Sequence, residues 1–223
     1  RVCWHRDVIV DHIVNNHKDK CYYSYIEKNI TLGIQNSKNS DTGTTPTYEM
    51  FNREHEDWMT KPSYSVINDS YVQVVTESFF DPNSIAVAFN GINEQGNSDI
   101  NIKPIGTPNG LITEKTYKTF LYEQPMLLVA FPGILAQLKE IGYKTFPEFF
   151  DEDYDTEQHH HTRMHKIIAS LDKFMQMDLN KVHKLYHSDP VQEKLKHNKK
   201  LLLKNTIESP INKWFVPNKQ YQL

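Results

Sequence analysis

The sequence predicts an α/β fold, a parallel sheet with helices on both faces, followed by a helical C-terminal extension. Two apolar segments have the composition of buried strands, Ser70 to Thr76 and Met126 to Ala130. A helical pattern begins at Thr113 between them, and another follows from Pro132 to Ile141. Because strands that alternate with helices normally join into a parallel sheet, this order favours helices packed on such a sheet.

The N-terminal part of the chain contains one predicted helix and two long polar loops. Residues Trp4 to His17 have a helical pattern, and the apolar and aromatic segment Cys21 to Ile26 has the composition of a strand. Residues 36–47 are rich in Asn, Ser, Thr and Gly, and residues 79–110 contain four glycines and three prolines. Because long loops in compact domains are often binding loops, residues 79–110 are interpreted either as a loop over a ligand or as an insertion without a role.

The segment from Thr113 to Phe120 is the most informative part of the chain. Thr113 is a good N-cap, and Glu114 falls in the first turn, where the helix dipole stabilises a negative charge. The backbone amides of that turn, together with Lys115, are expected to attract a phosphate. A plain amphipathic helix with its apolar residues at helical spacing is the alternative interpretation.

The C-terminal part of the chain is predicted to be helical. The helix from Pro132 to Ile141 should end at Gly142, since glycine is the residue most favoured just after a helix. From Thr162 onward the pattern remains helical and becomes basic. The lysines between Lys194 and Lys204 are interpreted as a solvated helix face.

Composition and charge argue against several functions. The net charge of −3 and the pI of about 6.4 do not favour binding to nucleic acid or to an anionic membrane surface. No apolar run approaches the roughly 20 residues that a membrane-spanning helix needs. Cys3 and Cys21 are too few for a disulfide scaffold, so a reducing compartment is expected. Because the chain starts at Arg1 and enters a helical pattern at once, we also expect a fragment, a processed product or part of a longer protein.

Two clusters contain potential metal ligands. His161 and His165 are four residues apart, a spacing that can bind a divalent metal on a helix, and two further histidines precede them. The carboxylates between Asp151 and Asp155 can bind a cation in principle, but they lack the glycine of a calcium loop. No carboxylate or cysteine completes the histidine set at a recognisable spacing. We therefore interpret the histidines as a polar loop and helix start and the carboxylates as a solvated turn, and we predict no metal site.

Several short motifs occur in an order that resembles the nucleotide-sugar-binding half of GT-B glycosyltransferases. The strand that ends Val75-Thr76-Glu77-Ser78 precedes Thr113-Glu114-Lys115-Thr116-Tyr117-Lys118, and this order is most similar to the alpha-1,3-fucosyltransferases. The motifs imply a Rossmann-like, nucleotide-sugar-binding domain over residues 1–160, which is half of a GT-B architecture. A helical C-terminal extension over residues 161–223 would follow.

A second group of proteins shares other segments of the chain. The runs Gly142-Tyr143-Lys144-Thr145-Phe146 and Asp151-Glu152-Asp153-Tyr154-Asp155 resemble segments of uncharacterised glycosyltransferase-like proteins from viruses and bacteria. The opening His5-Arg6-Asp7-Val8 is similar to a His-Arg segment at the start of their donor-binding domain. Together the two resemblances cover the chain roughly from Trp4 to Leu171.

The resemblance implies roles for five residues in binding the donor. Glu114 would contact the ribose of the nucleotide, and Lys115 would contact the diphosphate. Arg6 would pair with the same diphosphate, and Glu77 would lie near the sugar or the nucleotide. Lys118 belongs to the same donor-binding set. The resemblance names no catalytic base.

We therefore expect a protein that binds a nucleotide-diphosphate sugar and transfers the sugar to an unidentified acceptor, such as a glycan or a protein. Neither a metal nor another cofactor is expected, and the expected location is the cytoplasm of a host or bacterial cell. Because GT-B enzymes use two Rossmann-like domains, the acceptor site would come from a second domain or a protein partner. The alternative is a non-catalytic structural or interaction protein, for example of a virus particle, built on a degenerate glycosyltransferase fold.

Overall fold

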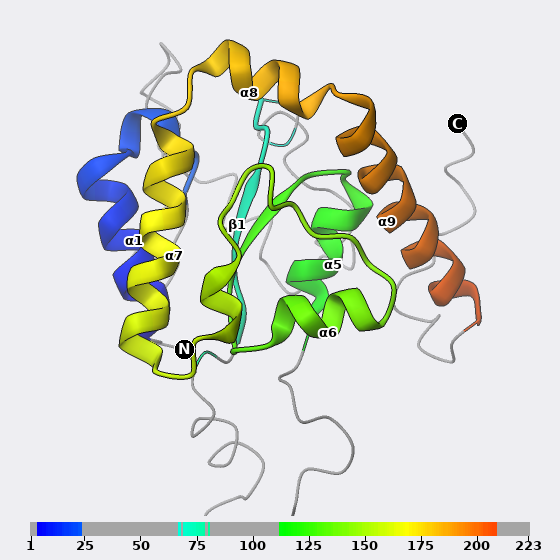
Figure 1. Cartoon of the computed structure of the whole chain (residues 1–223), viewed down its shortest axis with the longest axis horizontal. Coiled ribbons are helices and arrows are strands. Elements are labelled where there is room, and N and C mark those ends of the chain that lie inside the picture. Colours follow the sequence, from blue (N-terminus) through cyan, green and yellow to red (C-terminus); the bar gives the residue numbers. More distant parts are fainter. Residues whose placement is uncertain (1–3, 24–66, 68, 79, 81–111, 209–223) are drawn as a thin grey trace, which may run out of the picture. The chain divides into compact units, whose positions relative to one another are not determined.

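The structure, a computed structural model, describes residues 4–23, 67, 69–78, 80 and 112–208 (Figure 1). It contains two compact units, residues 1–71 with 206–223 and residues 72–205, and each is described by itself. The predicted loops at 36–47 and 79–110 lie outside the described residues, except for Phe80. Position 160, the boundary expected from the sequence, falls within the second unit.

The described part of the first unit begins with helix α1, Trp4–Asn16, which confirms the helix predicted there. The buried residues of α1 recur at helical spacing and are His5, Ile9, Val10 and Ile13. A short 3-10 helix, η1, spans Lys18–Lys20. Cys21 has an extended backbone, but the described part of the predicted strand, Cys21 to Tyr23, forms no strand. Extended backbone becomes a strand only where it pairs with a neighbouring strand.

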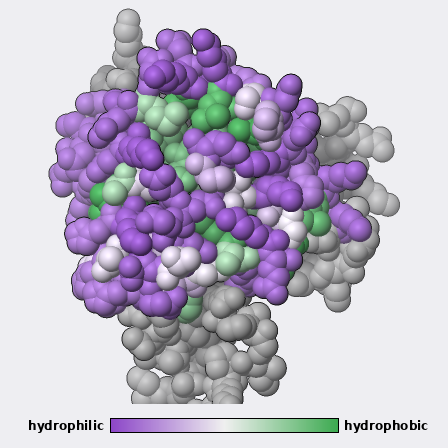
Figure 2. Space-filling view, in the orientation of Figure 1, coloured by the Kyte–Doolittle hydropathy of each residue, from purple (hydrophilic) through white to green (hydrophobic). Residues whose placement is uncertain are grey.

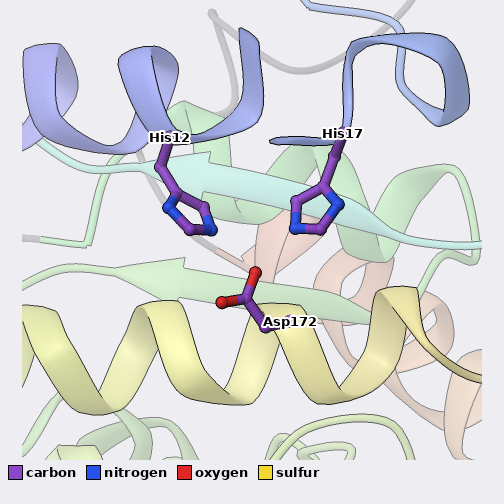
Figure 3. Close-up of side chains that lie close together, drawn as sticks. All are labelled: His12, His17 and Asp172. Atoms are coloured by element: carbon purple, nitrogen blue, oxygen red, sulfur yellow. The ribbon is translucent and has the colours of Figure 1, made fainter. Parts of the chain in front are cut away.

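Two histidines lie close together at the end of α1. His12 lies on the helix and His17 just after it, with ring centroids 5.4 Å apart in an edge-to-face arrangement (Figure 3). The third side chain drawn there, Asp172, belongs to helix α7, His160–Met175, of the second unit. No site is assigned to the three residues, because the relative position of the two units is not determined.

The second unit contains a small parallel sheet. Strand β1, Gln73–Thr76, pairs in parallel with strand β2, Met126–Val129, in the register Gln73 to Met126 and Thr76 to Val129. The backbone N–H of Glu77 donates to the carbonyl of Val129 at 3.0 Å, which extends the pairing beyond β1. Every residue of β2 is buried, as expected for a strand at the centre of a hydrophobic core. Both strands coincide with apolar segments from which strands were predicted.

Helices α5 and α6 follow β1 and β2 respectively along the chain. Helix α5, Glu114–Leu121, lies between the two strands in sequence and packs against β1. Helix α6, Ile134–Glu140, ends as predicted at Gly142, whose φ of 97° lies in the left-handed region. The N–H of Gly142 donates to Lys139 O, and that of Tyr143 donates to Leu138 O. These are the two hydrogen bonds of a Schellman motif, which explains why a glycine is needed at this position.

The described residues from Thr162 to Glu208 are mostly helical, as predicted, and the predicted extension beyond Glu208 lies outside the described residues. A 3-10 helix, η3, spans Asp153–Thr156 and contacts α6 and α7. Helix α7, His160–Met175, packs against β2, and helices α8, Leu179–Tyr186, and α9, Asp189–Glu208, follow. The predicted lysine-rich face lies on α9.

Helix α9 is anchored to the segment that follows α6. Asn198 is fully buried, and its amide accepts from Lys144 N and donates to Lys144 O, both at 2.8 Å. His197 Nε2 lies 2.9 Å from the carbonyl of Gly142. The side chain of Asn198 therefore supplies the hydrogen-bond partners that a neighbouring backbone segment would otherwise give to Lys144. Buried polar groups normally have such partners.

The described residues form a mixed α/β fold that is mostly helical, with a two-stranded parallel sheet. The surface face in Figure 2 is mainly hydrophilic, with hydrophobic residues in small separate patches. Within the described part of the chain, no helix combines the length and apolar composition needed to cross a membrane.

Candidate functional site

The carboxyl end of β1 meets the first turn of α5 through Glu77. This side chain is 1% exposed, and its carboxylate accepts three hydrogen bonds. The donors are Thr113 N at 3.1 Å, Thr113 Oγ1 at 2.6 Å and Thr116 Oγ1 at 2.5 Å. A buried carboxylate with both oxygens bonded in this way holds the N-terminus of α5 at the end of the strand.

Thr113 caps α5, as the sequence predicts. Its backbone is extended, and its Oγ1 accepts a hydrogen bond from Lys115 N at 3.4 Å while donating to Glu77. The amides of Thr113 and Lys115 are thus already bonded within the protein. The Glu77 carboxylate occupies the place that an anion takes at a helix N-terminus. A phosphate at this edge would therefore depend on side-chain cations more than on these two amides.

Lys115 and Lys118 supply cations on the same helix. Lys115 Nζ donates to Ser78 Oγ at 3.2 Å, so its ammonium group lies where β1 ends. Lys118 is half-buried, and burial lowers its pKa, which the charge of Glu114 raises and that of Lys115 lowers. Glu77 and Lys115 therefore both lie at the carboxyl end of β1, with Glu114 in the same first turn of α5, whereas Lys118 lies in its last turn.

An aromatic cluster supports α5. The rings of Phe120 and Tyr143 are stacked with centroids 4.3 Å apart, and Tyr117 lies 6.1 Å from Tyr143. Burial raises the pKa of Tyr117, and the charge of Glu77 raises it further. The phenol of Tyr117 thus stays protonated beside a buried carboxylate.

Arg163 is a buried positioning residue that the sequence reasoning missed. Its side chain on α7 is fully buried, and its guanidinium donates to the carbonyls of Glu157, Gln158 and Phe80. The guanidinium carbon also lies 4.3 Å from the centroid of the Phe80 ring. Since Phe80 comes two residues after Ser78, Arg163 fixes the chain just beyond the carboxyl end of β1. In the sequence, Arg163 lies four residues before Ile167, which is buried in the structure, and this helical spacing indicates that both residues lie on one face of α7.

Asp155 corrects the interpretation of the acidic segment as a solvated turn. This residue is buried, and its carboxylate accepts from Leu135 N at 2.9 Å and Ala136 N at 3.0 Å. It therefore caps α6, and burial raises its pKa. The neighbouring carboxylates form surface ion pairs, Asp151 with Lys173, Glu152 with Lys139 and Asp153 with Lys166. Asp155 is buried because its carboxylate accepts the hydrogen bonds of the first amides of α6.

Arg6 lies on α1 in the first unit. Its predicted convergence with Lys115 on one diphosphate stays a prediction. The histidine segment forms a helix start as predicted, with His159 as the N-cap of α7 and His160 as its first residue.

No protein-family model, curated protein or solved structure matches the chain. Its function is therefore inferred from the residues at the carboxyl end of β1 and the N-terminus of α5.

Proposed function

We propose that the chain is the donor-binding half of a GT-B-type glycosyltransferase, with a Rossmann-like fold, and binds a nucleotide-diphosphate sugar at the carboxyl end of β1. The observation that carries this proposal is the contact between Lys115 Nζ and Ser78 Oγ, 3.2 Å, beside a helix N-terminus fixed by Glu77. The contact holds a cation at the edge of the sheet where open α/β folds bind their ligands.

The order of the elements supports the same location. Among the described elements, strand β1, helix α5 and strand β2 occur in this order, and the two strands are parallel. Such a β-α-β unit is the building block of nucleotide-binding domains, and its helix begins at the carboxyl edge of the strands.

Each predicted residue has a distinct part in the proposed site. The ammonium groups of Lys115 and Lys118 neutralise the diphosphate, and the carboxylate of Glu114 accepts hydrogen bonds from the ribose hydroxyls. We assign Glu77 to positioning, because both of its carboxylate oxygens are engaged with α5.

These cations also define the proposed chemistry. During transfer an acceptor oxygen bonds to the anomeric carbon, and the bond from that carbon to the diphosphate breaks. The diphosphate leaves with the electron pair, and fixed positive charges stabilise the negative charge that develops on it. The acceptor and the base would come from a second domain or a partner.

Nucleotide titration tests the proposal. Calorimetry with UDP, GDP, CDP and dTDP, each in EDTA and in magnesium, should show binding of at least one nucleotide. Its affinity should be equal in both buffers within about threefold, a difference under ~1 kcal/mol. A strict magnesium requirement would contradict the metal-independent site, and no binding by any of the four would contradict the donor site.

A second candidate is an interaction protein that retains the fold without chemistry. The observation that favours it is the position of Glu77, whose negative charge already fills the N-terminus of α5. Failure of all four nucleotides to bind, with the protein folded, would support this candidate.

A further inference from the structure

Four histidines that have no assigned part in the donor site gather at the start of α7. His159 is the N-cap, His160 and His161 begin the helix, and His165 comes one turn later. The ring centroids of His160 and His161 are 4.2 Å apart, and those of His159 lie 5.2 Å and 5.8 Å from them. Three imidazoles therefore share one small area of surface.

His161 and His165 stand on the same face of α7. Residues four apart on a helix are neighbours, with Cβ atoms about 5–6 Å apart. Both side chains are exposed, so their rings can turn toward a common ion. Imidazole nitrogen is a ligand that zinc, nickel and copper prefer, whereas calcium and magnesium prefer oxygen.

We propose that His161 and His165, with His160 as the adjacent third imidazole, bind a divalent transition-metal ion such as Zn²⁺ or Ni²⁺. None of these histidines is among the residues assigned to the donor site, where no metal is expected. The ion would be held at the surface, with water completing its coordination.

Hydrogen bonds at the helix start hold His159 in position beside the other histidines. The Nδ1 atom of His159 accepts from Thr162 N at 3.4 Å, which requires an unprotonated Nδ1. The backbone N–H of His159 donates to Glu157 Oε1 at 3.0 Å, which places a carboxylate next to the histidines.

A second histidine pair provides a matched control. His183 and His187 are also four residues apart, near the end of α8, with ring centroids 4.4 Å apart, and both are exposed. This pair has the same spacing as His161 and His165, but no third histidine adjoins it in the sequence as His160 adjoins His161. Three ligands should hold an ion more tightly than two.

The test is calorimetric titration of the full chain, without a purification tag, with Ni²⁺ and with Zn²⁺. The double variant His161→Asn and His165→Asn should weaken the tighter binding step at least about tenfold, or ~1.4 kcal/mol. The double variant His183→Asn and His187→Asn should change that step by less than about threefold, or under ~1 kcal/mol. Circular dichroism checks that both variants keep their helices, as expected for exposed side chains. No binding by the unaltered chain, an unchanged tight step in the first variant, or equal loss in both would overturn the proposal.

Discussion

The carboxylate of Glu77 and the hydroxyl of Thr113 lie 2.6 Å apart, although 36 residues separate them in the chain. Glu77 directly follows strand β1, and Thr113 caps helix α5. Their hydrogen bond fixes the position of the first turn of α5, and therefore of Lys115, relative to the end of β1. The geometry of the proposed donor site depends on this bond.

Replacing Glu77 by Gln should destabilise the fold by about 1–3 kcal/mol, the usual cost of leaving a buried polar group unpaired. The amide nitrogen of Gln cannot accept the hydrogen bond that one carboxylate oxygen now receives from the hydroxyl of Thr113. Urea unfolding measures the change. Glu140→Gln, at an exposed position of α6, should be neutral within about 0.5 kcal/mol. Equal stability of the two variants would contradict the assigned positioning role.

Replacing Asn198 by Ala should also destabilise the protein, by about 1–3 kcal/mol. The substitution leaves the N–H and the carbonyl of Lys144 without the partners that Asn198 now supplies. Lys200→Ala, at an exposed position of the same helix, is the control. Should thermal unfolding of both variants match that of the unaltered chain, Asn198 would not anchor the loop.

Gly142→Ala should cost about 1–2 kcal/mol, because a side chain disfavours the left-handed backbone found there. An added Cβ would also approach Leu201 Cδ2 to 3.2 Å. In the double variant with Leu201→Ala, the steric part of the destabilisation should disappear, and the cost of the left-handed backbone should remain. Denaturant titration of the two single variants and the double variant measures the coupling, and full stability of Gly142→Ala would contradict the described turn.

Local features of this structure were predictable from the sequence, because neighbouring residues decide them. The N-cap at Thr113 and the helix end at Gly142 each depend on residues a few positions away, and both were predicted. The strands at Val75 and Leu128 were predictable from their apolar composition.

Buried polar contacts were not predictable, because they join distant segments. Glu77 lies 36 residues from Thr113, Asp155 lies 20 from Leu135, and Arg163 lies 83 from Phe80. Nothing in the composition around Asp155 distinguishes it from its solvated neighbours. Its burial follows from the need of α6 for an acceptor at its N-terminus.

Diphosphate binding should weaken at alkaline pH through Lys118. Burial lowers the pKa of this lysine below its ordinary value of 10.5, and only the protonated amine attracts the diphosphate. Affinity should therefore be full below the lowered pKa and fall as the pH rises through it. Calorimetry from about pH 7 to about pH 10 measures the change. Lys118→Arg, which stays protonated, should keep its affinity over that range, and the same decline in both proteins would show that Lys118 is not responsible.

The most direct test of the donor site is the nucleotide affinity of Lys115→Ala, measured by calorimetry with the nucleoside diphosphate that binds best. The account predicts a loss of about 1.5–3 kcal/mol, the usual worth of a charge-assisted hydrogen bond, with little change in folding stability. Glu114→Ala should cause a similar loss, whereas Lys184→Ala, which removes an exposed lysine of α8, should leave the affinity unchanged. Unchanged affinity in both Lys115→Ala and Glu114→Ala would contradict the assignment of the carboxyl end of β1 as a nucleotide-sugar site.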